Sequence, residues 1–428
     1  MSIFIGIDIG TSACRACAIN ANADIVARFR LDLPAPVRTA EGVQQEPAVW
    51  WQALCASLQA LCTRIDPRQV ERMAVDGTSA TLLLCRPDGT PITPGLMYND
   101  MRAVTTAALI DQQAPAESAA RGASSSLAKC LYLRTECRDE PCLALHQADW
   151  LAGSLTGQYG LCDENNALKL GYDVEQRCWP AWLDNLPLAP VQLPQVVPPG
   201  TPIGTLRADL ADAWGLPAGV AVVAGTTDST AGFIASGANR IGTAVSSLGS
   251  TLVLKVLSER PVYAADYGVY SHRLGNCWLA GGASNAGGAV LQSLFGRCDI
   301  KRFTRLLKPA VPTGLDYYPL PGTGERFPVR DPELEPRLRP RPASDAVFFQ
   351  AILEALADIE QRGYRLLAEL GAPYPSRVLS VGGGAGNRGW QAIRAQRLRV
   401  PVSRPAHQEA AYGSALLALR GQAVFPDP

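Results

Sequence analysis

The chain has 428 residues and carries 39 basic and 39 acidic side chains, so its formal net charge is zero. This balance gives no sign of a protein that binds nucleic acid or a membrane surface. No apolar run approaches the roughly 18–20 residues needed to cross a bilayer, and the N-terminus lacks the features of a signal peptide. We therefore expect a cytoplasmic protein, with length for two or three domains.

The chain opens on an apolar segment, Ile3–Ile9, that runs into a polar turn. Apolar residues on both faces predict a strand in the middle of a sheet. Burying Asp8 at its end costs free energy unless a cation or another partner compensates the charge. Gly10 permits a tight turn whose N–H groups, with the hydroxyls of Thr11 and Ser12, can surround phosphate oxygens. An ordinary hairpin turn containing an Asp is the alternative.

Two further strands, a helix and another strand are expected after this turn, giving the order β-β-β-α-β. They cover 14–20, 25–31, 47–64 and 73–77. A similar order returns in the second half, where expected strands cover 221–225, 244–248, 252–257 and 268–272, and later elements cover 348–370, 378–381 and 411–419. The repetition predicts two related α/β domains, which we place at 1–235 and 236–428.

Two motifs in the second half share the chemistry of the opening turn. Asp228 follows an apolar strand that ends in glycine and threonine, and it precedes a helix of small residues. Capping that helix or offsetting its dipole is the alternative role for this carboxylate. Gly249 and Ser250 lie in a hairpin turn that resembles Gly10-Thr11-Ser12. Two such turns, one per half, could hold a polyphosphate from both sides.

A strand near the C-terminus leads into a run of glycines followed by a helix. Gly383 and Gly384 lack side chains, so a flat base or a ribose could lie on their backbone, with Asn387 and Trp390 at the helix start. The spacing from Gly384 also satisfies a dinucleotide-binding pattern. A dinucleotide fold needs several more βα units downstream, and too few residues remain for them.

Twelve cysteines raise the possibility of a metal site or of disulfides. Cys14 and Cys17 form the one Cys-x-x-Cys pair, but they fall in an expected strand whose alternation sends them to opposite faces. With three histidines and scattered cysteines, a structural zinc site is not expected. Buried, reduced thiols are the expectation.

Taken together and in this order, the motifs resemble the FGGY family of carbohydrate kinases over essentially the whole chain. This family shares its fold with actin, hexokinase and the heat-shock chaperone ATPases. The resemblance implies an α/β fold of two ribonuclease-H-like domains that flank a cleft for ATP and sugar. The motifs that carry it are Asp8-x-Gly10-Thr11, Asn99-Asp100-x-Arg102, Gly225-Thr226-Thr227-Asp228, Gly382-Gly383-Gly384 and the segment 409–415.

The resemblance also implies roles for individual residues. Asp228 would be the general base that takes the proton from the sugar hydroxyl, and Asp8 would hold Mg²⁺ through water. The residues implied for the nucleotide are Gly10, Thr11, Ser12, Gly249 and Ser250 at the phosphates, and Gly383, Gly384, Asn387 and Trp390 at the adenosine.

The sugar side departs from the xylulose kinases of the family, which carry Gly-Gln-Met-His-Gly after the first helix. Here Ser79 and Ala80 stand in place of the Met and His. This segment and the short chain resemble a small subgroup that phosphorylates D-ribulose, which Asp8, Ser79 and Asp228 would contact. Alternatively, the Ser79 hydroxyl could bond only to backbone.

Several alternatives remain at this stage. D-xylulose, ribitol or glycerol could be the substrate within the same family. An actin-like or heat-shock-chaperone-like ATPase without a sugar substrate is an alternative from a different class, because the fold is shared. Asp100 and Arg102 could shape the sugar pocket, although an ion pair inside the domain is favoured. A monomer or a homodimer is expected.

Overall fold

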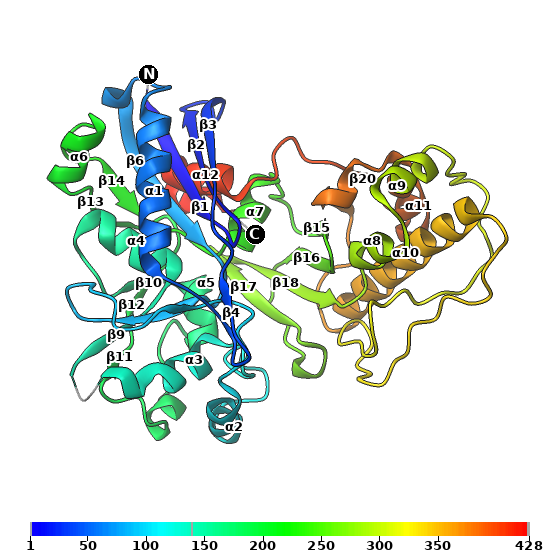
Figure 1. Ribbon diagram of the computed structural model, residues 1–428, viewed down its shortest axis with the longest axis horizontal. Coiled ribbons are helices and arrows are strands. Elements are labelled where there is room, and N and C mark those ends of the chain that lie inside the picture. Colours follow the sequence, from blue (N-terminus) through cyan, green and yellow to red (C-terminus); the bar gives the residue numbers. More distant parts are fainter. Residues whose placement is uncertain (1, 138–139, 426–428) are drawn as a thin grey trace. The chain divides into compact units, whose positions relative to one another are not determined.

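The computed structural model describes residues 2–137 and 140–425, which form two compact units. The first unit runs to Ala235 and also includes His407–Phe425, whereas the second comprises Ser236–Ala406. The C-terminal helix α12 (Ala410–Arg420), red in Figure 1, therefore belongs to the first unit. The sequence had placed this segment with 236–428.

The main sheet of the first unit has six strands in the order β13-β14-β6-β1-β2-β3. Every residue of β1 is buried, which confirms the expected central strand. β1 pairs antiparallel with β2 and parallel with β6, and this register sets Asp8 opposite Asp76. The strands are β1 (Ile3–Ile9), β2 (Ala13–Asn20), β3 (Ile25–Asp32), β6 (Val70–Gly77), β13 (Pro202–Thr205) and β14 (Ala221–Val223).

Two helices cover opposite faces of this sheet (Figure 1). Ile5 and Ile7 lie in one core cluster with Trp50 and Leu54 of α1 (Pro47–Cys62). The alternate residue Gly6 faces α12, because side chains alternate along a strand. Its lack of a side chain lets α12 lie directly on the strand.

Gly6→Val is therefore expected to destabilise the first unit. A Cβ at this position would lie 2.1 Å from the carbonyl oxygen of Ala411 and 2.1 Å from the backbone nitrogen of Ala415. Overpacking of a well-packed core costs about 1–3 kcal/mol, and this contact involves backbone that cannot rotate away. Thermal unfolding should show a lowered midpoint. Gly322→Ala is the control, because a Cβ there meets nothing within 4 Å. Equal midpoints for the two variants would contradict this packing.

The rest of the first unit contains a second sheet, a strand pair and helices. The second sheet has the order β11-β9-β7-β8-β5-β4, and β10 pairs with β12. The remaining elements are β4 (Val37–Arg38), β5 (Val43–Gln45), β7 (Leu82–Cys85), β8 (Gly95–Leu96), β9 (Cys142–His146), β10 (Leu161–Asp163), β11 (Val191–Gln192), β12 (Gln195–Val197), α2 (Val104–Gln113), α3 (Ser126–Leu133), α4 (Gln147–Thr156), α5 (Glu164–Ala167), α6 (Ala208–Trp214) and α7 (Asp228–Ala235).

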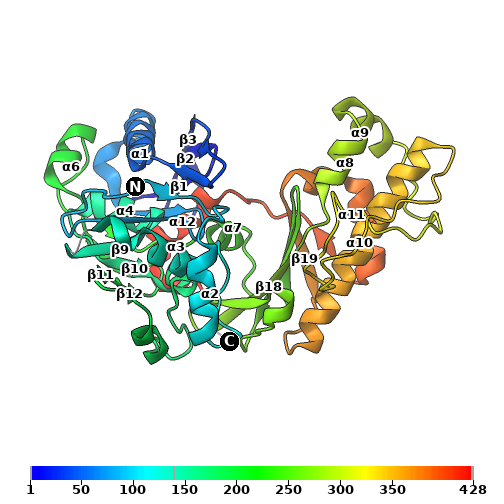
Figure 2. The same cartoon turned by 60° about the horizontal axis from the view of Figure 1, so that its bottom comes forward.

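The second unit has one six-stranded sheet in the order β17-β18-β16-β15-β19-β20. Its core includes Phe348, Phe349 and Ile352 of the long helix α10, which packs with α11 (Figure 2). The elements are β15 (Thr243–Leu248), β16 (Leu252–Ser258), β17 (Tyr270–Leu274), β18 (Cys277–Ser284), β19 (Arg377–Val381), β20 (Val402–Ser403), α8 (Gly288–Leu294), α9 (Arg297–Thr304), α10 (Asp345–Glu369) and α11 (Arg388–Leu398).

One pair of cysteines is oxidised, whereas reduced thiols were expected. Cys137 and Cys142 form a disulfide, with their Cα atoms 6.4 Å apart, so the expectation of reduced thiols throughout was wrong here. The disulfides of the described residues include none of the other ten cysteines. Burial raises the pKa of Cys14 to about 12 and that of Cys17 to about 11, which makes both thiols poor nucleophiles.

Among the described residues, no helix combines the length and the apolar character that a membrane span requires.

Candidate active site

Asp8 lies near the end of β1 and is 5% exposed. Its Oδ2 accepts a hydrogen bond from Nη1 of Arg15 at 2.9 Å. Burial raises the pKa of Asp8, and the neighbouring Arg15 guanidinium partly opposes that rise. The sequence predicted that a cation or another partner would compensate the buried charge of Asp8. Arg15 is one such partner.

Asp76, on the adjacent strand β6, is fully buried. The hydroxyl of Ser414 donates to its Oδ2, while its Oδ1 has no hydrogen-bond partner among the described residues. Burial, followed by the charge of Asp8, raises the pKa of Asp76 well above its usual range. The raised pKa favours the protonated form of Asp76, beside an Asp8 that is ion-paired with Arg15. Asp76 was not among the expected site residues; the one sequence signal for it is a carboxylate within a buried strand, and its pairing with Asp8 depends on the strand register.

Asp228 opens α7, directly after the polar segment that follows β14. Its Oδ1 accepts a hydrogen bond from the backbone N–H of Ser229 at 2.6 Å, and the residue is partly exposed. Its charge also contributes to the raised pKa of Asp76. Within the first unit, Asp76 thus interacts with the carboxylates of both Asp8 and Asp228.

The turn after β1 is closed by its own backbone. The N–H of Gly10 donates to the carbonyl of Ala13 at 3.0 Å, so this donor is already used. The hydroxyls of Thr11 and Ser12 make no hydrogen bond to any described residue, and Ser12 is exposed. The hydroxyls of Thr11 and Ser12 are therefore available to a ligand, whereas the N–H of Gly10 is not.

The corresponding turn in the second unit joins β15 to β16. Gly249 and Ser250 lie at its tip, and their carbonyls accept hydrogen bonds from the N–H groups of Gly288 and Ala289 at the start of α8. Ser250 is exposed. The hairpin expected from the sequence is therefore present and is held by the helix that follows the sheet.

The glycine run after β19 packs against this same hairpin. A Cβ on Gly384 would lie 2.9 Å from Cβ of Leu248, the last residue of β15, and 2.6 Å from the ring of Trp390. Gly382 has a positive φ of 84°, which favours glycine. At Gly383 a Cβ would meet nothing within 4 Å, so this backbone is open to a neighbour. The second unit thus brings the hairpin turn and the glycine run together.

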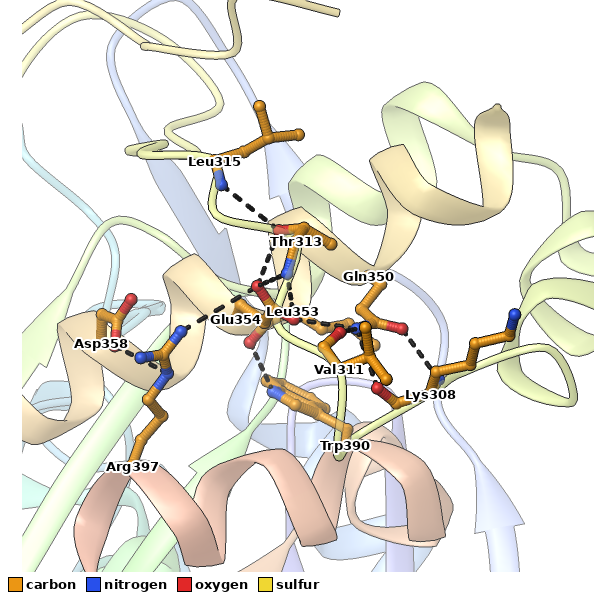
Figure 3. A network of polar contacts seen from close by, with 10 residues as sticks. All are labelled: Lys308, Val311, Thr313, Leu315, Gln350, Leu353, Glu354, Asp358, Trp390 and Arg397. Carbon is orange, nitrogen blue, oxygen red and sulfur yellow. Dashed lines mark hydrogen bonds and ion pairs between the residues drawn. The ribbon is translucent and has the colours of Figure 1, made fainter. Parts of the chain in front are cut away.

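The two residues expected beside the adenosine have structural roles. The side chain of Asn387 caps α11 by accepting the N–H of Trp390 at 2.9 Å, and its amide donates to Thr304. Trp390 is 5% exposed, and its indole N–H donates to the carbonyl of Leu353 at 3.0 Å (Figure 3). Its ring belongs to the core cluster of the second unit, and its role at the adenosine stays a prediction.

The sugar-side residues lie in the first unit. Ser79 is half-buried, and its hydroxyl makes no hydrogen bond to any described residue. Asp100 is fully buried; it accepts a hydrogen bond from Nε of Arg102 at 2.9 Å and another from the N–H of Val43 at 2.6 Å. The favoured ion pair inside the domain is therefore confirmed for Asp100 and Arg102.

Comparison with known proteins identifies the family. The model for the N-terminal domain of the FGGY family of carbohydrate kinases matches residues 3–235, and that for the C-terminal domain matches residues 244–421. The chain belongs to the FGGY family of carbohydrate kinases. It is thus an ATP-dependent phosphotransferase, and the predicted two-domain α/β fold of the actin and hexokinase type is confirmed.

Individual relatives agree with this assignment. The chain is 25% identical to a xylulose kinase of Escherichia coli over 92% of its own length and 84% of that protein. It is 26% identical to an L-fuculokinase of Salmonella typhi, with 94% and 88% covered. A xyloylose kinase from Brucella ovis has a similar structure, with a TM-score of 0.89 at 24% identity and coverage of 100% and 93%.

Proposed function

We propose that this FGGY kinase transfers the γ-phosphoryl group of ATP to a hydroxyl of D-ribulose and forms D-ribulose 5-phosphate. The observation that supports D-ribulose is the segment after β6, where Ser79 and Ala80 occupy the place of the Met and His of the xylulose kinases. The unused hydroxyl of Ser79 favours contact with a ligand over a purely structural role. D-xylulose is the second candidate, because several relatives are named xylulose kinases.

In this proposal the three sugar contacts come from the first unit. Asp8 and Ser79 bind sugar hydroxyls, and Asp228 binds the hydroxyl that attacks the γ-phosphorus. An aspartate is a weak base, but it can take the proton late in the reaction, when the attacking oxygen has become acidic. The partly exposed position of Asp228 at the start of α7 is compatible with access to a substrate.

Each unit has its own candidate nucleotide contacts. Thr11 and Ser12 from one turn, and Gly249 and Ser250 from the other, bind the β- and γ-phosphates. Gly383 and Gly384 carry the adenosine, with Asn387 at the edge and Gly10 shaping the first turn. The exposed hydroxyls and the open backbone at Gly383 support these roles.

Asp8 fits a role in holding Mg²⁺ through water. Carboxylate oxygens suit this ion, which keeps several of its waters. Because Arg15 already binds Oδ2 of Asp8, a hydrated ion fits this carboxylate better than a directly coordinated one. When bound, Mg²⁺ would neutralise negative charge on the phosphates.

A substrate panel tests the choice of sugar. D-ribulose, D-xylulose, L-ribulose, ribitol and glycerol are compared in a coupled assay of ADP formation. We expect kcat/KM for D-ribulose to exceed that for D-xylulose by at least about tenfold, the effect of roughly one well-placed hydrogen bond. A higher kcat/KM for D-xylulose would overturn the D-ribulose assignment and leave the kinase assignment intact.

A further inference from the structure

The turn that carries Ser79 is held by hydrogen bonds on both sides of that residue. The N–H of Thr78 donates to Oε1 of Gln147 at 3.0 Å. The hydroxyls of Thr78 and Thr81 are 2.5 Å apart, and the N–H of Gln147 donates to the carbonyl of Thr81 at 3.1 Å. The neighbours of Ser79 are therefore fixed while its own hydroxyl is unused by the described residues.

Ala80 holds the backbone of this turn in an unusual conformation. Its φ is +65°, in the left-handed region that residues other than glycine rarely adopt, and it is 1% exposed. Such a conformation is strained and persists only where the surroundings impose it. The carbonyl of Ala80 accepts a hydrogen bond from Nζ of Lys129 at 2.8 Å.

Lys129, on α3, is fully buried, which is rare for a lysine. Its Nζ donates a second hydrogen bond, also of 2.8 Å, to the carbonyl of Met97. The ion pairs of the described residues include none between Lys129 and a carboxylate. Burial lowers its pKa to about 7; Lys169 adds to this shift and Asp100 opposes it. The amine is therefore committed to two backbone carbonyls.

Those two carbonyls belong to different segments of the sugar side. Met97 lies three residues before the ion-paired Asp100, and the next residue, Tyr98, donates its N–H to the hydroxyl of Thr81 at 3.1 Å. The two hydrogen bonds of Lys129 thus link the turn that carries Ser79 to the segment that precedes the buried ion pair of Asp100 and Arg102.

We propose that Lys129 is a positioning residue for sugar selectivity: its amine holds the carbonyl of Ala80, and this fixes the direction of the Ser79 hydroxyl. The inference rests on the proposed function, because it assumes that Ser79 contacts the sugar. Lys129 itself would not touch the substrate.

Lys129→Met tests this role, because methionine has a similar length and no donor. We expect KM for D-ribulose to rise at least about tenfold, KM for ATP to change less than twofold, and the preference for D-ribulose over D-xylulose to fall about tenfold. Lys129→Gln keeps a shorter hydrogen-bond donor, so its KM for D-ribulose should rise less. This variant replaces Lys129→Met in the test if the methionine variant fails to fold. Lys301→Met, at an exposed position in the second unit, is the control for loss of a lysine.

Combining Ala80→Gly with Lys129→Met separates an effect on the position of Ser79 from an effect on the stability of the protein. Glycine adopts a positive φ without strain, so it should restore the thermal midpoint of Lys129→Met but leave the raised KM for D-ribulose. If KM recovers together with stability, or if KM and the sugar preference never change, the proposal is overturned. A wild-type preference for another sugar would instead refute the proposed function, and the variants would then be measured with that sugar.

Discussion

Asp228→Ala is expected to lower kcat for sugar phosphorylation about 10²- to 10⁴-fold, the usual contribution of a general base. Asp228 opens α7 at a partly exposed position, and the charge of its carboxylate acts on the buried Asp76. Its removal should leave thermal unfolding nearly unchanged, because the side chain is not part of the core. Steady-state measurement of sugar-dependent ADP formation gives the rate.

Two further variants make this result specific to the carboxylate. Asp228→Asn keeps the shape and the acceptor for Ser229 but removes the basicity, so its loss of kcat should approach that of the alanine variant. Asp209→Ala removes an exposed carboxylate of α6 that pairs with Arg207, and it should retain wild-type rates. Unchanged sugar-dependent ADP formation in Asp228→Ala would show that the base is another group.

Arg394→Met should destabilise the second unit by about 3–5 kcal/mol, the cost of leaving a buried charge without its partner. Arg394 and Glu360 are each 1% exposed, and two guanidinium N–H groups donate to the two carboxylate oxygens at 2.6 Å. A third group donates to the hydroxyl of Ser380, while Ser246 donates to Glu360. Urea unfolding followed by tryptophan fluorescence would measure the loss.

Loss of the ion pair between Arg394 and Glu360 should also change KM for ATP more than KM for the sugar. Ser246 and Ser380 face each other in the parallel register of β15 and β19, and these strands lead into the turn at Gly249 and into the glycine run. Loosening them should raise KM for ATP while leaving KM for the sugar nearly unchanged.

Controls separate the buried pair from ion pairs in general. Replacing Glu360 by Leu together with Arg394→Met should recover much of the lost stability, because both charges are then removed. Arg302→Met breaks an exposed pair with Asp299 and should cost no more than about 1 kcal/mol. A loss below about 1 kcal/mol for Arg394→Met would contradict the importance of this pair.

The parts of the fold that could be predicted from sequence are those with long hydrophobic patterns. The fully buried strand Ile3–Ile9 and the helix α10 have such patterns, and both are present. Strands such as β4, β8 and β11 have two residues each, too few for any periodicity to be visible. The return of α12 to the first unit depends on a long-range contact with Gly6, which no local pattern encodes.

In the candidate site too, residues with a local sequence signal could be predicted, and those that depend on long-range packing could not. Asp8 and Asp228 could be predicted as candidates because each stands beside glycine and hydroxyl residues at the end of an apolar strand. Asp76 was missed because its importance depends on the pairing register of β1 and β6. Trp390 was expected at the nucleotide because it follows the glycine run, whereas the core of the second unit takes up its ring.

The most direct test of the proposed function is identification of the product formed from D-ribulose and ATP. Purified protein is incubated with both and Mg²⁺, and the mixture is analysed by ³¹P NMR and mass spectrometry. The proposal predicts one sugar monophosphate, D-ribulose 5-phosphate, formed in equal amount to ADP. ADP without a sugar phosphate, or no reaction with D-ribulose beside rapid phosphorylation of D-xylulose, would contradict it.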